Sequence, residues 1–98
     1  MRGGKRDANQ AEIKLALESI GCAVEDTADV GSLIPGFPDL VASGLHRKLM
    51  IPYTALIEVK TVDGKLRPGQ IDFHRRHECG AIFTVRTISE ALQIFGVE

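Results

Sequence analysis

Apolar residues in the first twenty positions recur at helical spacing. A stripe of them begins at Ile13 and ends at Ile20, and Gly21 follows as a residue that commonly ends a helix. Asp7 or Asn9 precedes the stripe and is suited to cap the helix start. The pattern therefore predicts a helix ending near residue 20. Its apolar stripe consists of Ile13, Ala16, Leu17 and Ile20.

The rest of the chain predicts a mixed order of strands and helices. A loop over residues 26–37 is rich in Gly and small polar residues. Pro68 suits a first helical turn and Gly80 a helix end, while Thr87 is expected to cap a last helix from Ile88. The resulting order, αβββαβα, predicts an α/β fold with a mixed sheet flanked by helices. The predicted strands cover residues 22–25, 39–43, 54–61 and 81–85.

The third predicted strand contains two charged residues in an otherwise apolar run. Alternation places Leu56, Glu58 and Lys60 on one face. A hairpin turning symmetrically about residues 48 and 49 would place Asp39 opposite Glu58, and directly opposed side chains lie close together. The sequence therefore predicts that two carboxylates and one ammonium group meet on this face.

Two neighbouring carboxylates repel unless a proton or a cation lies between them. Mg²⁺ takes oxygen ligands and keeps several waters, so Asp39 and Glu58 fit its requirements, with Mn²⁺ as a substitute. Glu12 borders the apolar stripe of the first helix and is a candidate third ligand. Lys60 is then placed to contact an attacking water or the charge that grows on phosphorus.

Length, composition and charge limit the kinds of protein that this chain can be. The 98 residues suit a single domain covering residues 1–98, and a hydrophobic content of 44% supports a folded core. We expect a cytoplasmic protein with no membrane association, because no apolar stretch reaches spanning length and residues 1–10 do not read as a signal peptide. We also expect reduced thiols at Cys22 and Cys79. The net charge of −1 is not a nucleic-acid signature, although residues 47–86 are locally basic.

Several motifs carry a resemblance to a known family. Pro38-Asp39 followed by Glu58-Val59-Lys60 resembles the PD-(D/E)XK nuclease signature, and the predicted element order is similar to the core of that superfamily. More narrowly, GFPDL (36–40), IEVK (57–60), KLRPGQ (65–70) and Gly80 resemble the virus-type replication-repair nuclease domain, VRR-NUC, in its stand-alone phage or bacterial type. The resemblance spans roughly residues 9–86.

The resemblance implies a DNA endonuclease that uses Mg²⁺ or Mn²⁺, acting as a homodimer on four-way (Holliday) junctions. By the same resemblance Lys60 is the catalytic lysine, and Gln70 belongs to the active site. Asp39 and Glu58 are the metal ligands with catalytic roles. The Val59 carbonyl is an additional ligand, and Glu12 matches the acid of the first helix.

Basic residues around these motifs are predicted to bind the DNA backbone, so that DNA shape rather than base sequence is recognised. Spacing also allows a zinc site at His74, His77 and Cys79. The predicted loop 44–53 has a basic part and an apolar part, and the apolar part either contacts a second subunit or rejoins the core. The predicted DNA-binding residues are Arg47, Lys48, Lys65, Arg67, His74, Arg75 and Arg76.

Other interpretations stay open. Glu58 and Lys60 can form an ion pair on a solvated edge strand, which would add little stability. Glu12 can be an ordinary surface residue. The same site can serve flap cleavage or exonuclease action, and the fold can also serve a DNA-binding module without catalysis.

Overall fold

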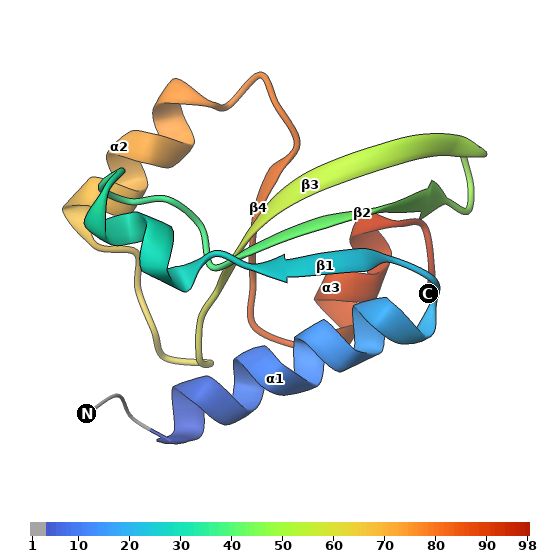
Figure 1. The fold of residues 1–98 in the computed structure, drawn as a ribbon, viewed down its shortest axis with the longest axis horizontal. Coiled ribbons are helices and arrows are strands. Elements are labelled where there is room, and N and C mark those ends of the chain that lie inside the picture. The colour runs from blue at the N-terminus through green and yellow to red at the C-terminus, as the bar shows by residue number, and fades with distance from the viewer. Residues whose placement is uncertain (1–3) are drawn as a thin grey trace.

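The computed structural model describes the backbone of residues 4–98 and the side chains from residue 9 onward (Figure 1). A four-stranded sheet in the order β1-β2-β3-β4 forms the centre. Within the described residues, no helix combines the length and the apolar character needed to cross a membrane. The elements are α1 (Gly4–Ser19), β1 (Ala23–Asp26), the short 3₁₀ helix η1 (Ala28–Ser32), β2 (Leu40–His46), β3 (Ile51–Val59), α2 (Pro68–Arg76), β4 (Ile82–Val85) and α3 (Ile88–Ile94).

The sheet is mixed, as the sequence predicts. Strand β2 pairs antiparallel with β1 and β3, whereas β3 pairs parallel with β4. Leu40 faces Ile57 and Ser43 faces Thr54, which confirms the predicted hairpin register. The predicted α/β fold and element order are therefore correct, with η1 added inside the predicted loop.

One face of the sheet carries the hydrophobic core. Helices α1 and α3 lie on the same side of the sheet and contact each other (Figure 1). Alternation brings Leu40 and Ala42 of β2 onto the face that Ala55, Ile57 and Val59 of β3 also share. Because burial of apolar side chains is the main favourable term in folding, this face anchors the whole chain. The fully buried core residues of the helices and of the chain end include Ile13, Leu17, Ala91 and Phe95.

The hairpin between β2 and β3 is longer than the sequence predicts. The predicted ten-residue loop 44–53 is wrong, since β2 continues to His46 and β3 already begins at Ile51. Tertiary contacts extend the strands: the Tyr53 ring packs edge-on against His46 and Phe95, and the Arg47 amide donates to the Phe95 carbonyl. The apolar residues of the tip do not rejoin the core. Leu45, Leu49, Met50 and Ile51 are exposed.

The segment of residues 27–39 closes on itself and packs against α2. At its closed end, the Thr27 amide donates to the Asp39 carbonyl. At its other side, Gly36 has φ +82°, and an added Cβ there would lie 2.2 Å from the Gly69 carbonyl oxygen. Phe37 contacts Phe73 of α2 edge-on, with ring centroids 5.4 Å apart. These contacts place Asp39, the residue that precedes β2, near the first turn of α2.

We predict that Gly36→Ala destabilises the protein by about 2–4 kcal/mol, because it adds backbone strain at positive φ and forces Gly36 away from Gly69. Urea unfolding followed by circular dichroism measures this loss. Gly31→Ala is the matched control, since an added Cβ there meets no atom within 4 Å. Equal stability of the two variants would contradict the packing described.

Candidate active site

Two buried carboxylates lie on adjacent strands. Because Leu40 faces Ile57, Asp39 and Glu58 occupy the next facing positions of the hairpin. Asp39 is only 4% exposed and Glu58 is fully buried. The Val59 amide donates to Asp39 Oδ2 over 2.9 Å, which fixes the direction of that carboxylate. The structure thus brings these two predicted site residues together.

Gln70 holds the second carboxylate in place through both ends of its amide. Its Oε1 accepts from the Arg67 backbone amide over 2.8 Å, as part of the cap of α2. Its Nε2 donates to Glu58 Oε2 over 3.0 Å. Since the oxygen serves the helix cap, the amide nitrogen must face the acid. Gln70 therefore positions Glu58, and the structure brings this predicted site residue to the carboxylate pair.

Lys60 lies at the end of the same strand face. It is buried, and its Nζ is 3.6 Å from Glu58 Oε2. Its backbone is held on two sides, because the Lys60 amide donates to Val85 and the Asn9 side chain donates to the Lys60 carbonyl over 3.0 Å. The alternative of a solvated ion pair on an edge strand does not hold, since β3 is a central strand and both groups are buried.

Asn9 was a candidate for the cap of the first helix, but the structure gives it another role. Helix α1 begins at Gly4, so Asn9 lies inside the helix. Its side chain instead ties α1 to the end of β3 at Lys60. The only sequence signal was a polar residue at the start of an apolar stripe, which does not distinguish these two roles.

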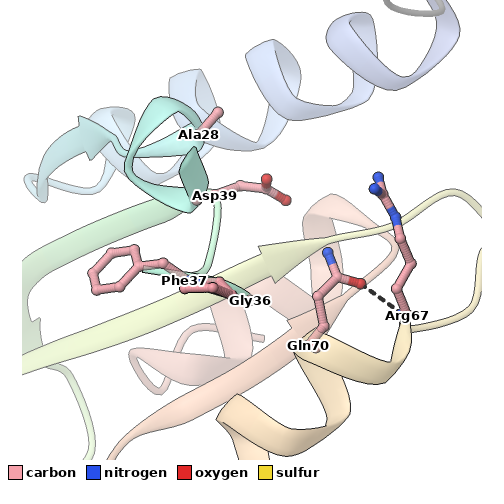
Figure 2. Close-up of a pocket in the computed structure, with 9 residues that line it drawn as sticks. Ala28, Gly36, Phe37, Asp39, Arg67 and Gln70 are labelled. Carbon is pink, nitrogen blue, oxygen red and sulfur yellow. Dashed lines mark hydrogen bonds between the residues drawn. The ribbon is translucent and has the colours of Figure 1, made fainter. Parts of the chain in front are cut away.

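A cleft of ≈ 490 Å³ is lined by Asp39 and by Gln70, the residue that hydrogen-bonds Glu58. One wall is the segment from Ala28 to Asp39, and the other is the first turn of α2 with Arg67 and Gln70. Figure 2 shows the Asp39 carboxylate and the Gln70 amide reaching into the same space, with the Arg67 side chain at its rim. The lining of the cleft thus includes one acidic residue, Asp39, and one basic residue, Arg67.

His74 lies on α2 one turn after Gln70 and is half-buried. Its Nε2 is buried and has no hydrogen-bond partner among the residues that the structure describes. Burial, and secondarily the nearby charge of Lys60, lowers the pKa of His74 below its ordinary value of 6.5. The side chain is therefore a neutral imidazole at neutral pH, and the predicted phosphate contact cannot rest on its charge.

Glu12 is not joined to the carboxylate pair. It is exposed on α1, away from the buried stripe of Ile13 and Leu17. Among residues with described side chains, no three His, Cys, Asp or Glu residues gather to hold a metal. The structure therefore does not bring Glu12 to Asp39 and Glu58, and it does not gather His74, His77 and Cys79 into a metal-binding group. His77 instead stacks on the Phe73 ring, with centroids 4.3 Å apart.

Two predicted DNA-binding arginines, Arg75 and Arg76, point away from the cleft. Both form ion pairs with Asp72 on the outer side of α2, at 2.9 and 3.0 Å. Helical periodicity places these three residues opposite the face that carries Gln70 and His74. The structure does not bring this pair of arginines to the carboxylates.

Arg47 and Lys48 lie at the hairpin turn, at the opposite end of the sheet from α2 and η1 (Figure 1). Seven residues of β3 separate the turn from Glu58, or roughly 25 Å at ~3.3 Å per residue. Arg47 donates to the Ile20 carbonyl, and Lys48 pairs with Glu98. Of the predicted basic residues, Arg67 lines the cleft, and Lys65 lies two residues before it on the same loop.

The oxygen donors around Asp39 and Glu58 fit a hard divalent cation. Asp39 and Glu58 supply carboxylate oxygens. The Val59 amide faces Asp39, and both backbone groups of a strand residue point to the same edge, so the Val59 carbonyl also faces that side. A site with this few protein oxygens leaves places for water and phosphate oxygens, which is the usual manner of Mg²⁺ binding.

Comparison with known proteins identifies the fold. The chain has an α/β fold in which a mixed four-stranded sheet is flanked by helices. This fold is that of the VRR_NUC domain: a solved structure of such a domain is similar with a TM-score of 0.68 and 22% sequence identity, covering 94% of this chain and 95% of that chain. No family model matches the sequence, and no curated protein matches it.

We predict that Mn²⁺ raises the thermal midpoint of the protein, because a ligand that binds only the folded state stabilises it by about 2.7 kcal/mol at one hundred times its dissociation constant. Asp39→Asn and Glu58→Gln should each remove most of this shift. Glu12→Gln is the matched control and should keep it. Differential scanning fluorimetry with and without Mn²⁺ measures the effect, and a lost shift in Glu12→Gln would restore Glu12 as a ligand.

Proposed function

We propose that the protein is a metal-dependent nuclease that hydrolyses phosphodiester bonds of DNA. The observation that carries this proposal is the pair of buried carboxylates, Asp39 and Glu58, with Lys60 beside Glu58 and with Asp39 lining an open cleft. Burying three charged groups together is costly unless they are paired, hydrogen-bonded or bound to a metal ion, and one ammonium group balances the charge of only one of the two carboxylates. The VRR_NUC fold of the chain supports the same function.

The residues of the chain have distinct tasks in this proposal. Asp39 and Glu58, with the Val59 carbonyl, would hold Mg²⁺ or Mn²⁺. When bound, such an ion lowers the pKa of a coordinated water and polarises a phosphate. Gln70 keeps Glu58 in a fixed orientation through its hydrogen bond. Lys60 provides a positive charge at the edge of the pair, where it orients the attacking water and stabilises the charge on phosphorus.

The rim of the cleft provides the contact to the DNA backbone. Arg67 lines the cleft and Lys65 lies on the same loop, so both are suited to bind phosphates that flank the scissile bond. The loop is fixed from β4, because the Arg86 guanidinium donates to the Gly64 carbonyl over 2.8 Å. Backbone contacts of this kind hold DNA without reading its sequence.

We predict that Lys60→Ala and Asp39→Asn each lower the rate of DNA cleavage with Mn²⁺ at least about 100-fold, because each removes charge stabilisation in the transition state. Fluorescently labelled four-way, flap and linear DNAs, resolved on gels, measure the rates. Lys14→Ala is the matched control, since Lys14 pairs with Glu18 on the surface of α1. Cleavage at the parental rate in either site variant would refute the assigned chemistry.

The finer proposal is a homodimer that cuts four-way junctions. Two-fold symmetric junctions need two matched cuts, which a two-fold dimer supplies. The exposed apolar residues Leu45, Leu49, Met50 and Ile51 at the hairpin tip support a subunit contact there. Their place at the far end of the sheet leaves the cleft of each subunit open to DNA (Figure 1).

We predict that the double substitution Leu49→Ser and Met50→Ser converts a dimer to a monomer, because it removes exposed apolar surface from the contact. Analytical ultracentrifugation measures the mass. The variant should also lose paired cuts in four-way DNA while keeping single cuts. Leu15→Ser changes an equally exposed leucine on α1 and should stay dimeric; a monomeric parent, or a dimeric double variant, would exclude this contact.

A further inference from the structure

The face of α1 that packs on the sheet carries a polar residue at its start. Asn9 lies about one helical turn before Ile13 and two turns before Leu17, so the three side chains share one face of the helix. Ile13 and Leu17 are fully buried, and Asn9 is half-buried. Asparagine is a weaker helix former than leucine, and a buried amide is costly without hydrogen bonds. Its place on this face therefore indicates a specific partner.

That partner is the backbone of Lys60, at the point where the chain leaves the sheet. The Asn9 Nδ2 group donates to the Lys60 carbonyl over 3.0 Å, although 51 positions separate the two residues in the sequence. Strand β3 ends at Val59, so Lys60 is the first residue beyond it. Helix α1 thus contacts the chain at the end of β3 that carries the charged groups of the site (Figure 1).

The sheet itself holds only one side of the Lys60 backbone. The Lys60 amide donates to the Val85 carbonyl over 2.9 Å, which extends the parallel pairing of β3 with β4 by one bond. A further bond of this ladder would need a β4 amide for the Lys60 carbonyl, but β4 ends at Val85 and Thr87 already caps α3. Among the residues with described side chains, Asn9 provides the donor at this carbonyl. The Lys60 backbone is therefore held from the sheet and from α1 together.

The placement of this backbone matters because of the side chain it carries. Lys60 Nζ is 3.6 Å from Glu58 Oε2, and Lys60 is only 6% exposed. The residues that follow, 61–67, lie outside helices and strands, so no regular element holds Lys60 from that direction. A displacement of about 1 Å at a catalytic group can lower a rate about 100-fold. A hydrogen bond that fixes the Lys60 carbonyl is consequently suited to protect the reaction rate.

We propose that Asn9 is a positioning residue for the catalytic lysine, because its hydrogen bond to the Lys60 carbonyl keeps the Lys60 ammonium group beside the metal-binding carboxylates. This inference rests on the proposed function, which gives Lys60 its part in DNA cleavage. Asn9 contacts neither DNA nor metal in this proposal. Its loss should therefore slow the chemical step and leave the binding of DNA and of metal unchanged.

The first test compares the kinetics of Asn9→Leu, which keeps the approximate size of the side chain and removes its donor, with those of Gln10→Leu. Gln10 is the matched control, because its amide also joins α1 to the sheet over 3.0 Å, through the exposed Asp26. With four-way DNA and Mn²⁺, Asn9→Leu should lower kcat at least about tenfold at an unchanged KM. Gln10→Leu should match the parent, and Asn9→Gln, which restores an amide donor, should recover most of the lost rate.

Two further measurements separate positioning from a general loss of structure. Asn9→Leu should keep the Mn²⁺-induced rise of the thermal midpoint, because Asp39 and Glu58 are unchanged. Hydrogen exchange of the Lys60 amide, followed by NMR, reports on the bond to Val85 and does not depend on cleavage. Asn9→Leu should speed this exchange about tenfold, the scale of one hydrogen bond, while Gln10→Leu leaves it unchanged.

A parental kcat in Asn9→Leu, or an equal loss of rate in Gln10→Leu, would overturn the inference. A lost Mn²⁺ shift in Asn9→Leu would also overturn it, because Asn9 would then act on the carboxylates. If Asn9→Leu does not fold, Asn9→Ala takes its place under the same criteria. A parent that cuts no DNA with Mn²⁺ would refute the nuclease. In that case faster exchange at Lys60 in Asn9→Leu alone would still support the hold of Asn9 on Lys60, and unchanged exchange would overturn it.

Discussion

The register between β2 and β3 is the constraint on which the site depends. It brings Asp39 and Glu58 to facing positions, and the Val59 amide then fixes the direction of the Asp39 carboxylate. A shift of one residue would turn one acid to the other face of the sheet and expose core residues such as Ile57. The apolar core on one face therefore maintains the polar site on the other. Stability and chemistry are connected through a single hairpin.

Helix α2 contributes to the site through backbone packing as much as through side chains. Gln70 completes the helix cap and holds Glu58 with the same amide. Gly36 and Gly69 lie so close that a methyl group does not fit between them. The helix start, the segment of residues 27–39 and the strand ends are consequently arranged as one unit, which is a requirement for a preorganised site.

Sequence patterns predicted the fold and the centre of the site because these depend on local periodicity. Alternation in β3 and a symmetric turn were enough to pair Asp39 with Glu58. Pro68 predicted the start of α2, and the resemblance of KLRPGQ to the VRR-NUC domain pointed to Gln70. Most of the features that the sequence did not predict are contacts between distant parts of the chain. The partner of Lys48, the long hairpin and the link from Asn9 to Lys60 all arise from tertiary packing, which spacing in one sequence does not show. The ion pair of Arg75 with Asp72, in contrast, is local to α2.

The close backbone contact at Gly36 has a consequence for the spacing of the cleft walls. The segment of residues 28–39 and the first turn of α2 meet at this contact, and a side chain at residue 36 would push the two walls apart. The width of the cleft on this side is therefore determined by the absence of a side chain at one position.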